Sequence, residues 1–214
     1  LLAAVGKVGN EFVDEPAPHL EKEGIAPFLD REARTARSIT GELTWNWGDG
    51  YVVIDTPRTP AVGGYAGGAA VETADARFEI STPYGAVLIT SADDESPIAS
   101  SDRILVTALG RARNTGTRYG NAADRTETTD RQATEIHLPP EHRVAVLEVG
   151  TAPILPEPIL GQISLAIPQP ESARAFVLND AGDRIGPVET EIEAGRLVLP
   201  LPGHHRSRFV EIAR

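Results

Sequence analysis

The sequence predicts an all-β protein, an antiparallel β-sandwich of the jelly-roll type followed by a smaller antiparallel β-sheet or sandwich unit. Runs of strand-forming residues recur about every 10 to 15 residues with turn signals between them, as in most sandwiches. The 17 prolines and 20 glycines are spread along the chain without a repeat, which favours short strands over long helices. A regular alternation of apolar and polar residues between positions 41 and 56 predicts a pair of strands.

This strand pair is predicted to be a β-hairpin. Leu43, Trp45 and Trp47 alternate with polar residues, residues 48–50 form a Gly-Asp-Gly turn, and residues 51–56 return along the first strand. The alternation gives the hairpin one apolar face. We interpret that face as part of the core, because large aromatic side chains usually anchor cores.

Further strands are expected at residues 76–80, 85–91 and 103–109. The last run is almost continuously apolar and rich in β-branched residues, which is typical of a strand covered on both faces. We divide the chain into a connector at 1–40, a sandwich core at 41–120, an exposed loop at 121–140 and a second small β unit at 141–214. The second unit either packs with the first as one domain or stands alone.

Composition excludes several classes of function. The formal net charge of −11 argues against binding to nucleic acid or to an anionic membrane, since both need a basic surface. The chain has no cysteine, so disulfides and thiolate chemistry are excluded. It also has no methionine, and we expect it to be an internal or C-terminal piece of a longer product. Any secretion signal would then lie upstream.

No motif for a reaction or a cofactor is present. The sequence lacks a Gly-x-Ser-x-Gly elbow, a P-loop and a dinucleotide fingerprint, so no cofactor is expected. Residues 93–95 and 204–205 lack the ligand spacing of dedicated calcium or zinc sites, and no metal site is predicted. Glycoside hydrolysis needs paired carboxylates, but spacing alone pairs none of the acidic residues in strand-like runs, and no catalytic residue is predicted. These residues are Glu42, Asp55, Glu79, Glu148 and Glu157.

Aromatic residues offer one possible binding site. Sugars stack their apolar faces on exposed rings, and Trp47, Tyr51 and Tyr65 are the candidates for carbohydrate contact. Aromatic residues make up only 5% of the chain, which leaves few for a binding platform. The alternative is that the rings near the hairpin belong to the core.

Three residues of the hairpin region are predicted to have structural roles. Trp45 is expected to pack in the first sheet. Arg58 is expected to form a buried ion pair with Asp55 or Glu42 and so to fix the exit of the returning strand.

Several segments together resemble a known family. Residues 41–45 and 53–58, residues 83–116 and residues 152–184 follow an order and spacing similar to the β-sandwich regions after the catalytic (β/α)8 barrel in large bacterial glycoside hydrolases. The resemblance runs over most of residues 38–214. It implies a non-catalytic accessory region that packs on an upstream catalytic barrel and helps to shape its substrate cleft for a poly- or oligosaccharide. It also implies secretion or a periplasmic location.

Whether this segment has any enzyme activity is left open, because the catalytic carboxylates of such enzymes belong to the barrel. Two other functions also stay open. The first is a stand-alone carbohydrate-binding module that uses the aromatic residues above. The second is a structural or assembly sandwich whose sheets are covered by identical subunits.

Overall fold

A computed structural model describes residues 2–6, 22–93, 96–121 and 144–214. The chain divides into two compact units. Unit 1 comprises Leu1–Gly110 and Pro158–Arg214, and unit 2 comprises Arg111–Glu157. Each unit is described separately below.

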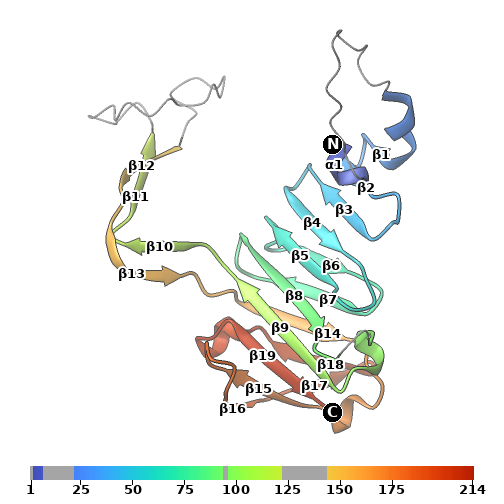
Figure 1. Ribbon diagram of the computed structural model, residues 1–214, viewed down its shortest axis with the longest axis vertical. Helices are drawn as coiled ribbons and strands as arrows, with labels where there is room; N and C mark the ends of the chain where they lie inside the picture. Colours follow the sequence, from blue (N-terminus) through green and yellow to red (C-terminus); the bar gives the residue numbers. More distant parts are fainter. Residues whose placement is uncertain (1, 7–21, 94–95, 122–143) are drawn as a thin grey trace, which may run out of the picture. The chain divides into compact units, whose positions relative to one another are not determined.

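Unit 1 contains a ten-stranded antiparallel sheet (Figure 1). Neighbouring strands follow the order β1-β2-β3-β4-β5-β8-β9-β19-β15-β16, so the C-terminal strand lies between strands from the middle of the chain. The strands are β1 (Leu29–Asp30), β2 (Thr35–Arg37), β3 (Leu43–Asn46), β4 (Tyr51–Ile54), β5 (Ala61–Gly64), β8 (Gly85–Ser91), β9 (Arg103–Leu109), β15 (Arg174–Leu178), β16 (Arg184–Val188) and β19 (Phe209–Ala213).

A second, five-stranded antiparallel sheet also belongs to unit 1, in the order β17-β18-β14-β7-β6. Strands from both halves of the chain meet in it, because β14 pairs with β7 on one side and with β18 on the other. The strands are β6 (Ala70–Glu72), β7 (Ala76–Ile80), β14 (Gly161–Leu165), β17 (Glu191–Glu193) and β18 (Arg196–Pro200).

The core lies between these two sheets. Alternate residues of β7 and β8 are buried, as expected for strands that turn one face to a core. Phe78 and Ile163 from the five-stranded sheet and Ile89 and Val106 from the ten-stranded sheet belong to one buried apolar cluster. The molecule is therefore an antiparallel β-sandwich, and the predicted all-β class is confirmed.

The described residues also form short helical segments. α1 (Leu2–Val5) and the 3-10 turn η1 (Lys22–Phe28) precede the first strand, and the 3-10 turns η2 (Ile98–Ser100), η5 (Pro170–Ser172) and η6 (Pro202–His205) connect strands. Within the described part of the chain, no helix is long and apolar enough to cross a membrane.

Unit 2 consists of two pairs of antiparallel strands. β10 (Ala112–Thr115) pairs with β13 (Thr151–Pro156), and β11 (Arg118–Asn121) pairs with β12 (Val144–Glu148). Each pair contains a register shift of the kind that a β-bulge produces. All residues of β13 are exposed.

Several predicted elements have the expected bounds. The hairpin forms from β3 and β4, and the strands expected at 76–80, 85–91 and 103–109 are β7, β8 and β9. Residues 122–140 of the expected exposed loop lie outside the described residues. Strands β14 to β19 (residues 161–213) join the same two sheets as strands from the first half of the chain.

One glycine of the glycine-rich run at residues 63–68 has a clear conformational role. Gly64 ends β5 with φ of 119°, a region that side chains rarely adopt. A Cβ at this position would also lie 2.4 Å from the carbonyl oxygen of Gly50. The close approach of the two backbones therefore requires glycine here.

Candidate functional site

The outer face of the ten-stranded sheet, which points away from the core, carries rows of apolar side chains. Directly paired residues of antiparallel strands share a face, so the strand register identifies each row. The first row crosses seven strands and contains only apolar residues and glycine. Its members are Leu29, Ala36, Trp45, Val52, Gly63, Ala86 and Leu109.

Two further rows lie beside the first, and together the three rows form what we call the apolar face. Thr107, Thr90 and Glu211 are the polar members of these two rows. The second row contains Leu43, Ile54, Ala61, Leu88, Thr107 and Phe209, and the third contains Thr90, Leu105, Glu211 and Phe176.

The apolar face is only partly shielded from solvent. Leu43 and Val52 are each 39% exposed and Leu109 is 43% exposed. Within the described residues of unit 1, the five-stranded sheet covers the opposite face and no further sheet covers this one. Contiguous apolar area of this kind is uncommon on the surface of a soluble monomer and usually marks an interaction site.

Two expectations from the sequence are corrected here. The apolar side of the hairpin, with Leu43, Trp45 and Trp47, is not part of the core between the sheets: Leu43 and Trp45 belong to the outer rows, and Trp47 lies beside Trp45. In β9, Ile104, Val106 and Ala108 are buried while alternate residues remain partly exposed. The described part of the chain therefore covers only one face of this strand.

At one end of the apolar face the two tryptophans line a hollow of about 260 Å³. Leu29 and Arg31 complete its walls, and we call it the tryptophan hollow. The ring centroids of Trp45 and Trp47 are 6.1 Å apart, with an angle of 59° between the planes. Both rings are half-buried. The hollow thus offers aromatic surface together with a guanidinium group.

The other predicted carbohydrate contacts lie elsewhere. Tyr51 is on the inner face and packs against the core, so the sheet separates it from the tryptophan hollow. Tyr65 is 60% exposed and contacts Tyr84 edge to face, with ring centroids 4.9 Å apart. The structure therefore does not bring Trp47 and Tyr51 into one binding platform.

The predicted ion pair of Arg58 is not formed. Arg58 Nη2 donates instead to the carbonyl oxygen of Asp93 at 3.2 Å. The Asp55 carboxylate accepts a hydrogen bond from the Ala74 backbone N–H at 3.0 Å. Among these described side chains, no ion pair joins Arg58 to Asp55 or Glu42. Both predicted structural residues thus bond backbone groups of other segments.

At the other end of the apolar face lies a buried carboxylate. Glu211 is 5% exposed and accepts hydrogen bonds from Arg103 Nε at 2.7 Å and from Arg184 Nε at 2.5 Å. The Arg184 guanidinium also stacks over the Phe176 ring, 4.2 Å from its centroid. The hydrogen bond from Arg184, and then that from Arg103, lowers the pKa of Glu211 below its ordinary value. We call these three residues the Arg-Glu-Arg cluster.

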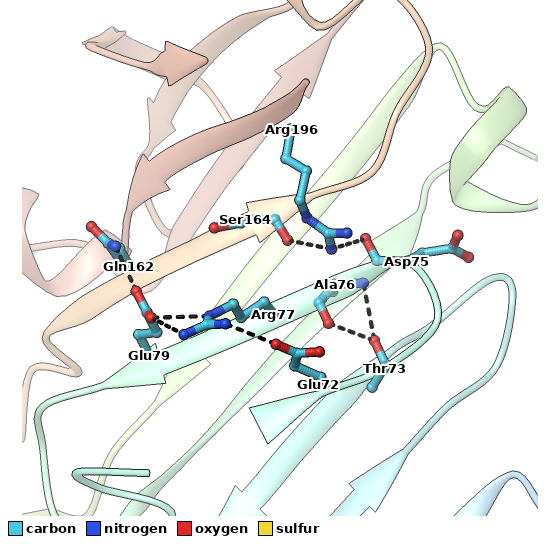
Figure 2. A network of polar contacts seen from close by, with 9 residues as sticks. All are labelled: Glu72, Thr73, Asp75, Ala76, Arg77, Glu79, Gln162, Ser164 and Arg196. Atoms are coloured by element: carbon cyan, nitrogen blue, oxygen red, sulfur yellow. Dashed lines mark hydrogen bonds and ion pairs between the residues drawn. The ribbon is translucent and has the colours of Figure 1, made fainter. Parts of the chain in front are cut away.

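The outer face of the five-stranded sheet is polar, as Figure 2 shows. Arg77 donates to Glu79 Oε1 at 2.8 and 3.0 Å and to Glu72 Oε1 at 2.8 Å. Gln162 Nε2 donates to Glu79 Oε2 at 2.6 Å. The bonds from Gln162 and Arg77 lower the pKa of Glu79. Arg196 bonds the carbonyls of Asp75 and Ser164, and we call this surface the polar face.

An open groove of about 610 Å³ runs beside this network. Glu79, Glu189 and Glu191 contribute carboxylates to its walls, and His204 Nε2 accepts a hydrogen bond from the Gly161 N–H at 3.1 Å. Among the described residues, no Phe, Tyr or Trp side chain lines it. The groove therefore lacks the stacking surface that sugar sites commonly use.

The remaining acidic candidates have local structural partners. Glu157 pairs with Arg111 and Glu148 with Arg118, both within unit 2. The Asp93 carboxylate accepts hydrogen bonds from the Ser101 hydroxyl and from backbone N–H groups, and the Ser101 bond lowers its pKa. Residues 94 and 95 of that turn lie outside the described residues. In the described part of the chain, no three His, Asp or Glu side chains are grouped to hold a metal ion.

The Arg-Glu-Arg cluster was missed in the sequence because its members are far apart. Arg103 is 108 residues from Glu211, and Arg184 is 27 residues from it. The one available signal is a glutamate inside an otherwise apolar strand, residues 209–213. Such a glutamate needs a cationic partner when it is buried, but the sequence does not identify the partner.

Comparison with known proteins identifies no relative. No protein-family model, no curated protein and no solved structure matches the chain. A function for the chain is therefore inferred from the chemistry of the faces described above.

Proposed function

We propose that this chain is a non-catalytic β-sandwich accessory region of a glycoside hydrolase, which packs through its apolar face on a catalytic barrel encoded upstream. One observation supports the packing: three rows of apolar side chains cross the outer face of the ten-stranded sheet. The outer faces of a sandwich are normally polar, because they contact water. The glycoside hydrolase part of the proposal rests on the resemblance of residues 41–45, 53–58, 83–116 and 152–184.

The size of the apolar face suits domain packing. With strands about 4.8 Å apart and same-face residues about 6.8 Å apart along each strand, the rows cover roughly 550 Å². Apolar patches of this size are often functional. Each partner of a standard interface buries about 800 Å², so the apolar face supplies roughly two thirds of such an interface.

The strand sequences support the same proposal. Residues 103–109 are apolar at nearly every position, and residues 85–91 have Ala86 and Leu88 between buried neighbours. Such sequences are typical of strands covered on both faces. A partner domain on the apolar face would supply the cover that is missing in this chain.

Sugar binding at the tryptophan hollow is a second candidate function. A sugar ring presents C–H groups that stack on indole and hydroxyl groups that accept hydrogen bonds from a guanidinium. Trp45, Trp47 and Arg31 provide both kinds of surface. At this position the hollow would contribute to one wall of a substrate cleft.

The test of the proposal is association in trans. The polypeptide encoded upstream of Leu1 is produced separately and titrated with the 214-residue chain by calorimetry. We expect micromolar or tighter binding, and a loss of about 100-fold or more for Leu88→Glu, which places a charge in the middle of the apolar face. The matched control is Ala70→Glu, which adds the same charge to the polar face and should leave binding unchanged.

Two results would contradict the packing proposal. One is the absence of binding, and the other is equal affinity for wild type and a folded Leu88→Glu variant. The sugar candidate is tested in parallel by titrating the chain with soluble oligosaccharides and recording tryptophan fluorescence. The only two tryptophans of the chain line the hollow, so sugar binding there should change the emission.

A further inference from the structure

We infer that the partner of the apolar face presents carboxylate side chains to the Arg-Glu-Arg cluster, so that this surface selects a partner with an acidic rim. The inference rests on the packing function proposed above and adds the charge of the partner. It follows from the charge of the face, the geometry of the two guanidinium groups and the cost of covering them with an apolar surface.

The end of the apolar face that carries the Arg-Glu-Arg cluster is positively charged, whereas the whole chain is negatively charged. The register places Arg103, Ala213 and Arg174 in one cross-strand row next to Glu211, and Arg184 reaches the same carboxylate. The Asp93 carboxylate also lies beside Arg103, whose charge helps to lower the pKa of Asp93, so three arginines and two carboxylates give this region a net charge of +1. The chain as a whole has a net charge of −11. A cationic region is thus retained beside an apolar surface in an acidic protein.

Within the described part of the chain, both guanidinium groups of the cluster keep donors that bind no acceptor. Arg103 and Arg184 each bond Glu211 through Nε. Among the described residues, no hydrogen bond joins the terminal nitrogens of either arginine to an acceptor. Their side chains are 63% and 45% exposed. The terminal N–H groups are therefore accessible to a partner.

The cluster is already held in place before a partner arrives. Glu211 fixes the Nε edge of both guanidinium groups, and Phe176 supports the plane of Arg184. An arginine held in this way loses little side-chain entropy when its remaining N–H groups bind a carboxylate, often through two parallel hydrogen bonds. The geometry therefore favours a carboxylate over a neutral acceptor.

A purely apolar partner would be disfavoured at this position. It would remove water from the terminal N–H groups of Arg103 and Arg184 without replacing the lost hydrogen bonds, and burial of unpaired charged donors is costly. A second copy of this chain is disfavoured for a related reason. Two copies packed through the same face with like ends together would bring two cationic regions into contact, and like charges across an interface repel.

The experiment compares two neutralised triads in the association assay. The test variant is Arg103→Gln/Arg184→Gln/Glu211→Gln, in which the amides retain hydrogen-bonding capacity. The matched control is Glu72→Gln/Arg77→Gln/Glu79→Gln, which neutralises the triad on the polar face. Binding to the polypeptide encoded upstream of Leu1 is measured by calorimetry from about 0.05 to 0.5 M NaCl, a range over which screening increases severalfold.

We expect the test variant to bind about tenfold more weakly than wild type at low salt and to lose most of the salt dependence. The control should stay within about twofold of wild type. Arg184→Lys keeps the charge but lacks the planar fork, and should fall between wild type and the test variant. Thermal unfolding of each variant establishes that it is folded, and Arg184→Lys serves as the test if the triple variant is not.

Equal affinity and equal salt dependence in wild type and a folded test variant would overturn the inference while leaving the packing function intact. Failure of wild type to bind at all would contradict the packing function itself, and with it this inference. Dimerisation of the chain alone in analytical ultracentrifugation, abolished by Leu88→Glu, would overturn the inference by assigning the face to a second copy.

Discussion

The two outer faces of the sandwich differ in polarity, although the outer faces of a sandwich are usually both polar. On the polar face, Arg77 joins Glu72 and Glu79, and Gln162 completes the network, so these charged groups bind one another (Figure 2). On the apolar face, three rows of mostly apolar side chains lead to the Arg-Glu-Arg cluster, whose arginines keep donors that no described residue accepts. The charged groups of the polar face bind one another and need no partner domain, whereas the apolar face has the composition of an interface core with a charged rim.

The inner faces show that the difference is not a requirement of the fold. Both sheets contribute to one buried cluster, including Phe78 and Ile163 from one sheet and Ile89 and Val106 from the other. A two-layer sandwich needs no apolar residues beyond these faces. The second apolar surface of the ten-stranded sheet is the surface that the proposed partner domain would cover.

The largest predicted effect is a difference in stability between substitutions on the two sides of strand β8. Ile89 is fully buried between the sheets, whereas its neighbour Leu88 lies on the apolar face. In the isolated chain, Ile89→Ala should lower the free energy of unfolding by about 2–5 kcal/mol. Leu88→Ala should lower it by only about 1 kcal/mol, because its side chain is partly hydrated already. Urea denaturation measures both, and equal losses would mean that Leu88 belongs to the core.

A smaller effect is expected at the Arg-Glu-Arg cluster. Replacing the buried carboxylate by Glu211→Gln should lower the free energy of unfolding at neutral pH by about 1–2 kcal/mol, since a charge-assisted pair becomes a neutral one. Glu79→Gln on the polar face should change it by at most about 0.5 kcal/mol, because that pair is more exposed. Denaturant titration of both variants measures the contrast.

The lowered pKa of Glu211 predicts how its contribution to stability changes with pH. The folded-state pKa of Glu211 is lowered from its ordinary value of 4.5, so its stabilising contribution is fully present above that value. The contribution is lost as the pH falls through the folded-state pKa. The difference in unfolding free energy between wild type and Glu211→Gln should thus be constant near neutral pH and shrink below about pH 4.5. A difference that grows in acid would contradict the assigned ion pairs.

Surface hydrophobicity should change with little loss of stability. The double variant Leu43→Thr/Val52→Thr replaces two exposed apolar residues of the face with polar β-branched ones. It should alter the free energy of unfolding by less than about 0.5 kcal/mol. It should also reduce the fluorescence of the dye ANS, which binds exposed apolar surface. Unchanged dye binding would indicate that these side chains are not accessible in solution.

A similarly small effect is expected at a glycine in the first apolar row. A Cβ at Gly63 would meet the Cβ of Ala86 at 3.5 Å, an ordinary contact. Gly63→Ala should stabilise the isolated chain by about 0.5 kcal/mol, because the unfolded chain loses freedom. Thermal unfolding measures the change. A destabilised variant would show that the backbone conformation at position 63 requires glycine.

The sequence was sufficient to predict which segments form strands, because alternation and turn residues are local signals. Residues 76–80 and 85–91 were predicted with their observed bounds. Alternation does not say which side of a sheet faces the core, however. Leu43 and Trp45 form an apolar side of the hairpin as expected, yet that side is the outer one.

Contacts between distant segments could not be predicted. Arg58 was expected to pair with an acidic residue of its own hairpin, but it bonds the carbonyl of Asp93, which is 35 residues away. Spacing along the chain also placed Trp47 and Tyr51 in one aromatic group, whereas the sheet separates them. In each case the deciding factor is how strands pair across the sheet, which depends on the whole fold.

The most direct test of the central claim is hydroxyl-radical footprinting of the apolar face in two contexts, the isolated 214-residue chain and the parent polypeptide. Leu109, Phe209 and Trp45 on the apolar face should be oxidised several-fold more slowly in the parent than in the isolated chain. Ile192, an exposed residue of the five-stranded sheet, should react equally in both. Equal oxidation of the apolar face in both contexts would contradict the claim that another domain covers it.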